Sequence, residues 1–209
     1  MAKKKKFPVK LFVFLLFLTP ALWLTYGMFN GLLGANPIET VLRDLGDWAL
    51  RFLILGLAVS TIRRLTGWAW VMKYRRMIGL YAFFYAFMHL SIYIGVDHFF
   101  DWSTIWKDIV KRPYITIGMT ALLLLIPLTI TSPKAMVRKL GGARWKNLHK
   151  LVYPIAILGV VHFFLLVKAD VREPLLYAAI LAFLLGERLY RRHENGKLFP
   201  LRNPNNISA

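Results

Sequence analysis

The chain of 209 residues is too apolar for a soluble domain of this size. Hydrophobic residues make up 57% of it and aromatic residues 15%, and so small a core cannot bury that many large side chains. The net charge of +18 is spread between apolar runs of about 20 residues, the length that crosses roughly 30 Å of hydrocarbon. These features predict an all-α, multi-span membrane protein and argue against nucleic-acid binding, which needs basic residues clustered on a soluble face.

The sequence contains no cysteine. This excludes disulfides, thiolate metal sites, iron–sulfur clusters held by cysteine and covalently attached heme, and leaves histidine as the strong nitrogen ligand. Neither glycine-rich nucleotide-binding pattern, G-x-G-x-x-G or G-x-x-x-x-G-K, occurs. If electrons start on NADH, another protein must therefore oxidise it.

In chain order, a basic cytoplasmic arm at 1–10 precedes six predicted spans, and a polar cytoplasmic tail occupies 193–209. The spans form a six-helix domain over 11–192, at about 11–29, 44–62, 75–95, 113–131, 145–167 and 174–192. We interpret the first as a transmembrane helix and not as a cleaved signal peptide, because no small-residue cleavage site follows it.

Two connections between these spans have distinctive compositions. The one between the third and fourth spans, VDHFFDWSTIWKDIVKR, is amphipathic and aromatic, so we expect it to lie along the membrane surface with His98 solvated or interfacial and not a ligand. The one between the fourth and fifth spans is strongly basic, with a helical part that ends at Gly141 and Gly142.

Charge predicts the orientation. Assigning the N-terminal arm, the second and fourth loops and the tail to one side places 21 of the 28 Lys and Arg residues there, and 8 of the 10 acidic residues on the other. Cytoplasmic loops carry the excess of Lys and Arg, so this division predicts six spans in the bacterial inner membrane with both termini in the cytoplasm.

His89 and His162 lie deep in the third and fifth spans. Counting about 1.5 Å per residue from the basic clusters before them, both are roughly 20 Å from the cytoplasmic edge. Ionisable side chains at such depth indicate function. We expect the imidazoles to face each other across one metal, with nitrogens about 4 Å apart. Nearby small residues, Ala82, Ala86 and Gly159, would leave room for a flat macrocycle or for plain helix packing.

Two nitrogen ligands and no thiolate suit heme iron, and two axial histidines would make it an electron carrier. The alternative is a hydrogen bond between the two histidines with no cofactor. A transporter that uses them as proton relays is a further hypothesis, but no paired mid-membrane carboxylates support it.

His149 lies 13 residues before His162, which suits a second cofactor nearer the cytoplasm. On an ideal helix the two side chains would point about 140° apart, unless Pro154 rewinds the turn between them. The third span offers no histidine at this level, only Arg75 and Arg76. The alternatives are a second heme with a weaker partner, an arginine–propionate contact, a quinone or flavin headgroup, or an interfacial histidine.

Arg51, near the outer end of the second span, follows Asp47 by one helical turn. The simplest interpretation is a local ion pair on one helix face, with the arginine side chain reaching toward the interface. Contact with a heme propionate is the alternative.

Several stretches, in this order and spacing, resemble one family. They are GLLGANPIE, RRMIGLYAFFYAFMHLSIY, RPYITIG and SPKAMVRKLGGARWKNLHKLVYPIAILGVVHFF. They are similar to the heme-binding membrane subunits of bacterial periplasmic methionine sulfoxide reductase systems, within the ferric-reductase-like transmembrane group. The resemblance covers roughly residues 10–192.

The resemblance implies heme b, FMN and a role as an electron relay. Members of this family take electrons from the quinone pool or a cytoplasmic flavin reductase and pass them to a periplasmic molybdopterin enzyme. Their histidine positions fall on His89, His149 and His162. Many ferric-reductase relatives have a fourth histidine, so the number of hemes stays open here. A ferric reductase or superoxide-type flavocytochrome subunit is the alternative function.

Overall fold

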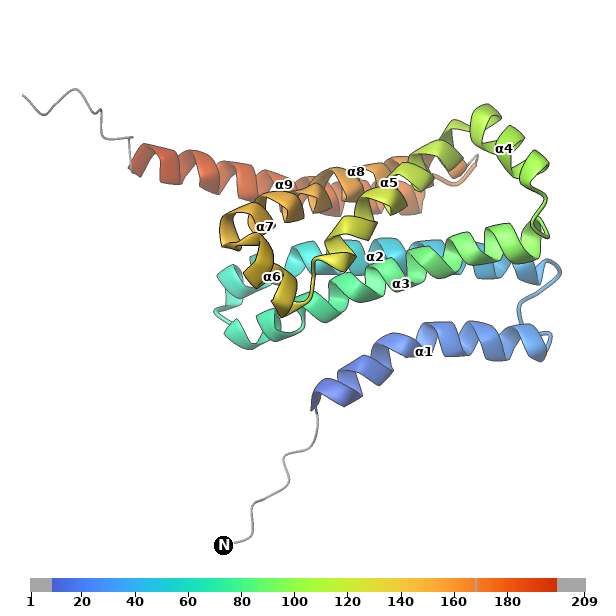
Figure 1. The fold of residues 1–209 in the computed structure, drawn as a ribbon, viewed down its shortest axis with the longest axis horizontal. Helices are drawn as coiled ribbons and strands as arrows, with labels where there is room; N and C mark the ends of the chain where they lie inside the picture. Colours follow the sequence, from blue (N-terminus) through green and yellow to red (C-terminus); the bar gives the residue numbers. More distant parts are fainter. Residues whose placement is uncertain (1–8, 168, 199–209) are drawn as a thin grey trace, which may run out of the picture.

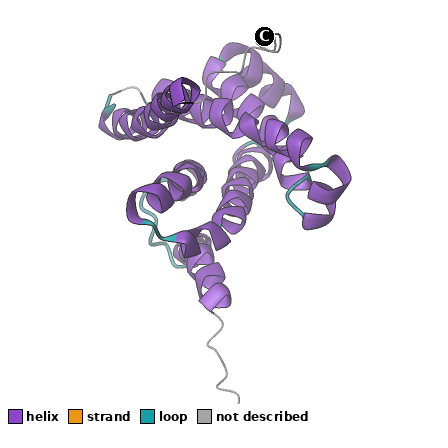
Figure 2. Ribbon diagram, turned by 90° about the vertical axis from the view of Figure 1, so that its left-hand side faces the viewer, coloured by secondary structure: helices purple, strands orange, loops and turns teal. Residues whose placement is uncertain are grey.

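The computed structural model describes residues 9–167 and 169–198, and every regular element in these ranges is a helix (Figure 2). Five helices are long and apolar enough to cross a membrane. They are α1 (Val9–Phe29), α2 (Pro37–Thr66), α3 with its π-helical end (Arg75–Asp97), α5 (Pro113–Ile130) and the composite Gly142–Leu166. The predicted all-helical membrane fold is confirmed to this extent.

The last helix, α9 (Arg172–Leu198), differs from these five. Its apolar stretch from Pro174 to Gly186 covers only 13 residues, fewer than the ~20 that span the hydrocarbon. The sixth span and the side of the termini therefore stay predictions. Residues 193–198, expected to start a polar tail, continue this helix, while residues 1–8 of the basic arm and 199–209 of the tail lie outside the described residues.

The bundle is built around two packed helix pairs, α2 with α3 and α5 with α8 (Val152–Leu166), and α1 lies outside the first pair (Figure 1). The short helix α4 (Trp102–Lys111) closes one end of the bundle. The opposite end carries α6 (Lys134–Leu140) and α7 (Gly142–Leu148). Gly141 separates these two helices with φ +77°, a conformation that glycine adopts without strain, as the predicted break required.

Helix α4 forms where the amphipathic connection was predicted. Asp101 caps it by accepting hydrogen bonds from the backbone N–H groups of Ser103 and Thr104. Trp102 and Trp106 are exposed on its apolar face, as suits a helix lying along the membrane surface.

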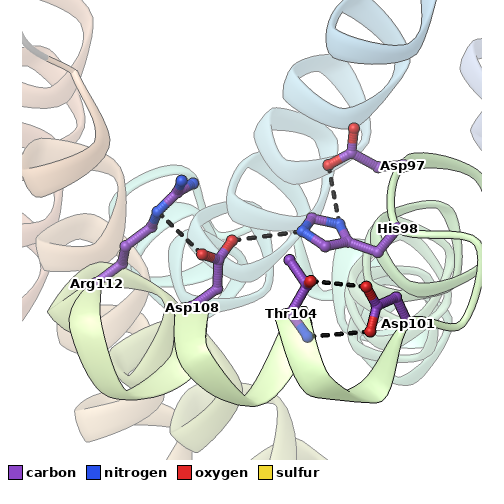
Figure 3. Close-up of a pocket in the computed structure, with 6 residues that line it drawn as sticks. All are labelled: Asp97, His98, Asp101, Thr104, Asp108 and Arg112. Atoms are coloured by element: carbon purple, nitrogen blue, oxygen red, sulfur yellow. Dashed lines mark hydrogen bonds and ion pairs between the residues drawn. The ribbon is translucent and has the colours of Figure 1, made fainter.

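His98 is largely buried, which excludes the solvated position and leaves the interfacial one that we also expected. Its ring packs on Tyr93, with centres 4.3 Å apart, and its nitrogens lie 3.2 Å and 3.4 Å from carboxylates of Asp97 and Asp108 (Figure 3). Only 12% of its side chain is exposed. The nearby carboxylates explain this burial, since they hold the ring against the end of the third span.

Tyr85 of α3 joins α1 to the bundle. Pro20 interrupts the hydrogen-bond ladder of α1, because proline has no backbone N–H. At this interruption, the Tyr85 hydroxyl of the fully buried side chain donates to the Phe17 carbonyl at 2.8 Å and accepts from the Ala21 N–H at 3.2 Å. In a regular helix those two backbone groups would bond to each other. The inserted hydroxyl thus satisfies both groups.

We expect Tyr85→Phe to lower the free energy of unfolding by about 1–3 kcal/mol, because it leaves a buried donor and acceptor without their partner. The measurement is thermal or denaturant unfolding in detergent micelles.

Tyr81→Phe is the matched control. That hydroxyl only donates to the Phe14 carbonyl, at 2.7 Å, so we expect a smaller loss. Equal stability of the Tyr85 variant and the wild type would contradict this account of how α1 is attached.

Candidate functional site

His89 and His162 lie next to each other in the structure. His89 comes from α3 and His162 from α8, so each of the two packed helix pairs supplies one imidazole. The ring centres are 6.2 Å apart and the rings are nearly perpendicular, at 85°. Both side chains are part-buried. Two residues 73 positions apart in the sequence thus form one site.

Each imidazole is held by a backbone carbonyl of the neighbouring helix. His89 Nδ1 lies 2.9 Å from the Leu42 carbonyl of α2, and His162 Nδ1 lies 2.6 Å from the Tyr114 carbonyl of α5. A carbonyl only accepts, so Nδ1 carries the proton in both rings and Nε2 keeps its lone pair. Metal-binding histidines show this arrangement, in which the second nitrogen fixes tautomer and ring orientation.

A glycine stands one turn after each of these carbonyls. Gly46 follows Leu42 by four residues and Gly118 follows Tyr114 by four, so each glycine lies on the same helix face as its carbonyl. A Cβ added to Gly118 would be 2.7 Å from His162 Nδ1, and one added to Gly46 would be 3.3 Å from His89 Nδ1. The missing side chains are therefore what lets each ring reach the backbone.

This geometry fits a metal between the rings. Two metal–imidazole bonds of roughly 2 Å each, together with the distance from each bonding nitrogen to its ring centre, come to about 6 Å. The observed separation of ring centres is 6.2 Å. Nitrogen-only ligation from two sides suits heme iron.

For Ala82 and Gly159, the structure shows helix packing, the second of the two roles that we considered. Ala82 is fully buried within the main apolar core, and a Cβ on Gly159 would meet a Leu50 methyl at 3.4 Å. Gly159 therefore serves helix packing between α8 and α2. The glycines that border the site are Gly46 and Gly118, which our sequence reasoning missed.

His149 lies near the opposite end of the bundle, in a 3-10 turn (His149–Leu151) between α7 and α8. The predicted fifth span is thus not one continuous α-helix, and the ideal-helix angle of 140° does not apply across this tighter turn. The ring stacks on Trp145 with centres 3.9 Å apart, and Nε2 lies 3.0 Å from the Thr131 hydroxyl. Neither Trp145 nor Thr131 was a predicted site residue.

Arg75 and Arg76 open α3 at the same end of the molecule and are exposed. The charge of Arg75 acts on His149.

Arg51 is fixed by local partners. Its Nε donates to the Tyr177 hydroxyl at 2.8 Å, and Nη2 lies 3.6 Å from Asp47. The guanidinium also lies over the Trp48 ring, 5.0 Å from its centre. The predicted Asp47–Arg51 pair is therefore present, and Tyr177 of α9 is an additional partner.

A pocket of about 450 Å³ lies beside α4, between this helix and the end of the third span (Figure 3). Its polar side chains pair with one another, for example Arg112 with Asp108 at 3.3 Å. In the part of the chain that the structure describes, no three His, Asp or Glu side chains are grouped closely enough to hold a metal ion. These ion pairs join the end of the third span to α4.

Comparison with known proteins agrees with the geometry. Residues 45–160 match the family model for the ferric reductase like transmembrane component. Three relatives named protein-methionine-sulfoxide reductase heme-binding subunit MsrQ are similar over most of their length. The protein of Rhodospirillum rubrum is 55% identical over 88% of this chain and 90% of its own, that of Azospira oryzae 48% over 93% and 84%, and that of Caulobacter vibrioides 45% over 90% and 93%.

The apolar helices and these relatives together make the chain a multi-pass protein of the bacterial inner membrane. Identity at this level over nearly the whole chain shows that it belongs to the MsrQ family, the heme-binding subunits of protein-methionine-sulfoxide reductases, within the ferric-reductase-like transmembrane group.

Proposed function

We propose that the chain is a heme b electron-transfer subunit that delivers electrons across the inner membrane to a periplasmic molybdopterin enzyme reducing methionine sulfoxide in oxidised proteins. The donor in this proposal is the quinone pool or a cytoplasmic flavin reductase. The observation that carries it is the pair of imidazoles 6.2 Å apart on separate helices, each held through Nδ1. The names of the relatives, which state heme binding and methionine sulfoxide reductase, support the same assignment.

His89 and His162 would hold the iron through their Nε2 lone pairs. The Leu42 and Tyr114 carbonyls accept the Nδ1 protons, which keeps both rings in the required tautomer and raises the basicity of Nε2. A heme with both axial positions filled carries single electrons and leaves no open position for oxygen. The site would lie in the outer half of the membrane, on the side of the acceptor.

A second cofactor site at the inner end completes the proposal. It includes His149, Arg75 and Arg76, and its ligand is a second heme, FMN or a quinone headgroup. Because His149 Nε2 is engaged by Thr131, the ring would bind through Nδ1 or exchange that partner. Arg51 would contact a heme propionate. Tyr177 and Asp47 already orient its guanidinium.

We also propose six spans with both termini in the cytoplasm, with α9 as the sixth. The separation of basic from acidic loops supports this topology.

Reporter fusions test the topology. Alkaline phosphatase, which is active only in the periplasm, should be inactive when fused after residue 209 and active when inserted after Asp170. A fluorescent protein at residue 209 should report the cytoplasm. Phosphatase activity at residue 209 would instead mean five spans.

Replacing either axial histidine tests the outer heme. We expect purified wild-type protein from heme-replete cells to show a Soret band and dithionite-reducible α and β bands. His89→Ala and His162→Ala should each lose the outer heme, because one imidazole cannot fill both axial positions. Pyridine hemochrome analysis gives the heme-to-protein ratio.

His98→Ala is the control, since its ring is held by Asp97 and Asp108 away from the pair. It should keep the wild-type spectrum. A colourless wild-type protein, or wild-type spectra in both axial variants, would end the proposal.

The glycines permit a graded test of ring positioning. Gly118→Ala puts a Cβ 2.7 Å from His162 Nδ1 and should weaken heme retention roughly 10- to 100-fold, as loss of a supporting contact does at metal sites. Gly46→Ala should have a smaller effect, because its Cβ would be 3.3 Å from His89 Nδ1. The measurements are heme retention and the reduction potential.

Gly79→Ala is the matched control, because a Cβ there meets no atom within 4 Å. If Gly118→Ala held heme as well as Gly79→Ala, the proposed positioning role would be wrong.

The family-model match favours one alternative, a ferric reductase or superoxide-type flavocytochrome subunit. Turnover of ferric chelates or oxygen by the reduced protein, compared with turnover of the periplasmic reductase, separates the two. Faster oxidation by the reductase supports the first proposal.

A further inference from the structure

Arg188 of α9 reaches across to two other helices. Its Nη2 donates to the Leu57 carbonyl of α2, and its guanidinium lies over the Tyr153 ring of α8, 5.4 Å from the ring centre. The guanidinium is therefore fixed in position between three helices. An arginine that only sought the membrane surface would not need these contacts.

The other terminal nitrogen, Nη1, is buried and has no hydrogen-bond partner among the described residues. Buried donors in proteins are nearly always paired, and an unpaired charged donor is more costly than a neutral one. The adjacent carboxylate does not serve it, because Glu187 pairs with Arg64 and Arg191. The structure thus holds a charged donor in place and leaves it unpaired.

Two arginines and one carboxylate, that of the already paired Glu187, act on Arg188. The charges of Arg64 and Arg75 both act on it, and Arg75 also acts on His149. The guanidinium lies over Tyr153, four residues after His149, so Arg188 is at the end of the bundle that carries His149. A fixed unpaired charged donor is suited to an anion, and arginine binds carboxylate and phosphate oxygens well.

We propose that Arg188 binds an oxyanion of a ligand at the inner end of the bundle. The ligand is a carboxylate or phosphate group, such as a heme propionate, the phosphate of FMN or the phosphate of an anionic lipid. This rests on the proposed function only in that the inner site is a cofactor site. The contact itself requires just the orphaned nitrogen.

Arg188→Gln tests the proposal in the full-length protein reconstituted in lipid nanodiscs. It removes the charge but keeps a polar side chain. Three measurements distinguish the sources: the heme-to-protein ratio, titration with FMN followed by flavin fluorescence, and native mass spectrometry of phosphatidylglycerol retained in anionic discs compared with phosphatidylcholine discs. We expect one of the three ligands to bind roughly tenfold or more weakly, as loss of a charge-assisted hydrogen bond implies.

Arg191→Gln is the matched control, since Arg191 is on the same helix but exposed and paired with Glu187. Arg188→Lys should recover part of the binding, because it restores the charge without the planar fork. If Arg188→Gln equals Arg191→Gln in all three measurements, the oxyanion site is refuted and Arg188 is only a structural cation.

The Soret band of the heme held by His89 and His162 should be unchanged in Arg188→Gln. Absence of that band from the wild type would refute the proposed function, while the FMN and lipid titrations would still decide the oxyanion site.

Discussion

The arrangement of this protein depends on two hydrogen bonds between a histidine and a backbone carbonyl. His89 bonds to Leu42 and His162 to Tyr114, and each bond joins the two helices of a packed pair. The same bonds leave Nε2 of each ring as the nitrogen for a metal. Each hydrogen bond thus both holds a helix pair together and orients its histidine. A glycine on the helix that supplies the carbonyl leaves room for the ring.

Polar contacts of this kind contribute more to holding the helices together here than in a soluble bundle. Between helices in lipid there is little hydrophobic driving force, because the lipid tails are as apolar as the side chains. The Tyr85 hydroxyl accordingly repairs the interrupted ladder of α1, and the Arg51–Tyr177 contact joins α2 to α9. Each contact satisfies groups that would be costly to leave unpaired in hydrocarbon.

The two ends of the bundle differ in chemistry. The end near α4 combines the His89–His162 pair with a group of carboxylates that hold His98. The end with His149 also carries Arg75 and Arg188, and Arg188 keeps an unpaired nitrogen. An outer site for an iron between neutral imidazoles and an inner site for an anionic group would place two kinds of ligand along one path across the membrane.

The sequence alone determined the helical membrane fold, most of the span positions and the histidines worth attention. Apolar runs of spanning length and ionisable residues inside them are visible in one dimension, and the cost of burying such residues marks them as functional. The resemblance read from the same stretches led to the family that the comparisons show.

Only the tertiary structure decided which groups meet. Gly46 and Gly118 resemble any helix-packing glycine in the sequence, and only the structure shows that Gly159, for which we considered both roles, packs against Leu50. The 3-10 turn at His149 changed the direction of that side chain, and the orphaned nitrogen of Arg188 depends on contacts more than 30 residues away in the sequence. Such features depend on which sides of separate helices pack against each other. Hydropathy and residue spacing along the chain do not specify this.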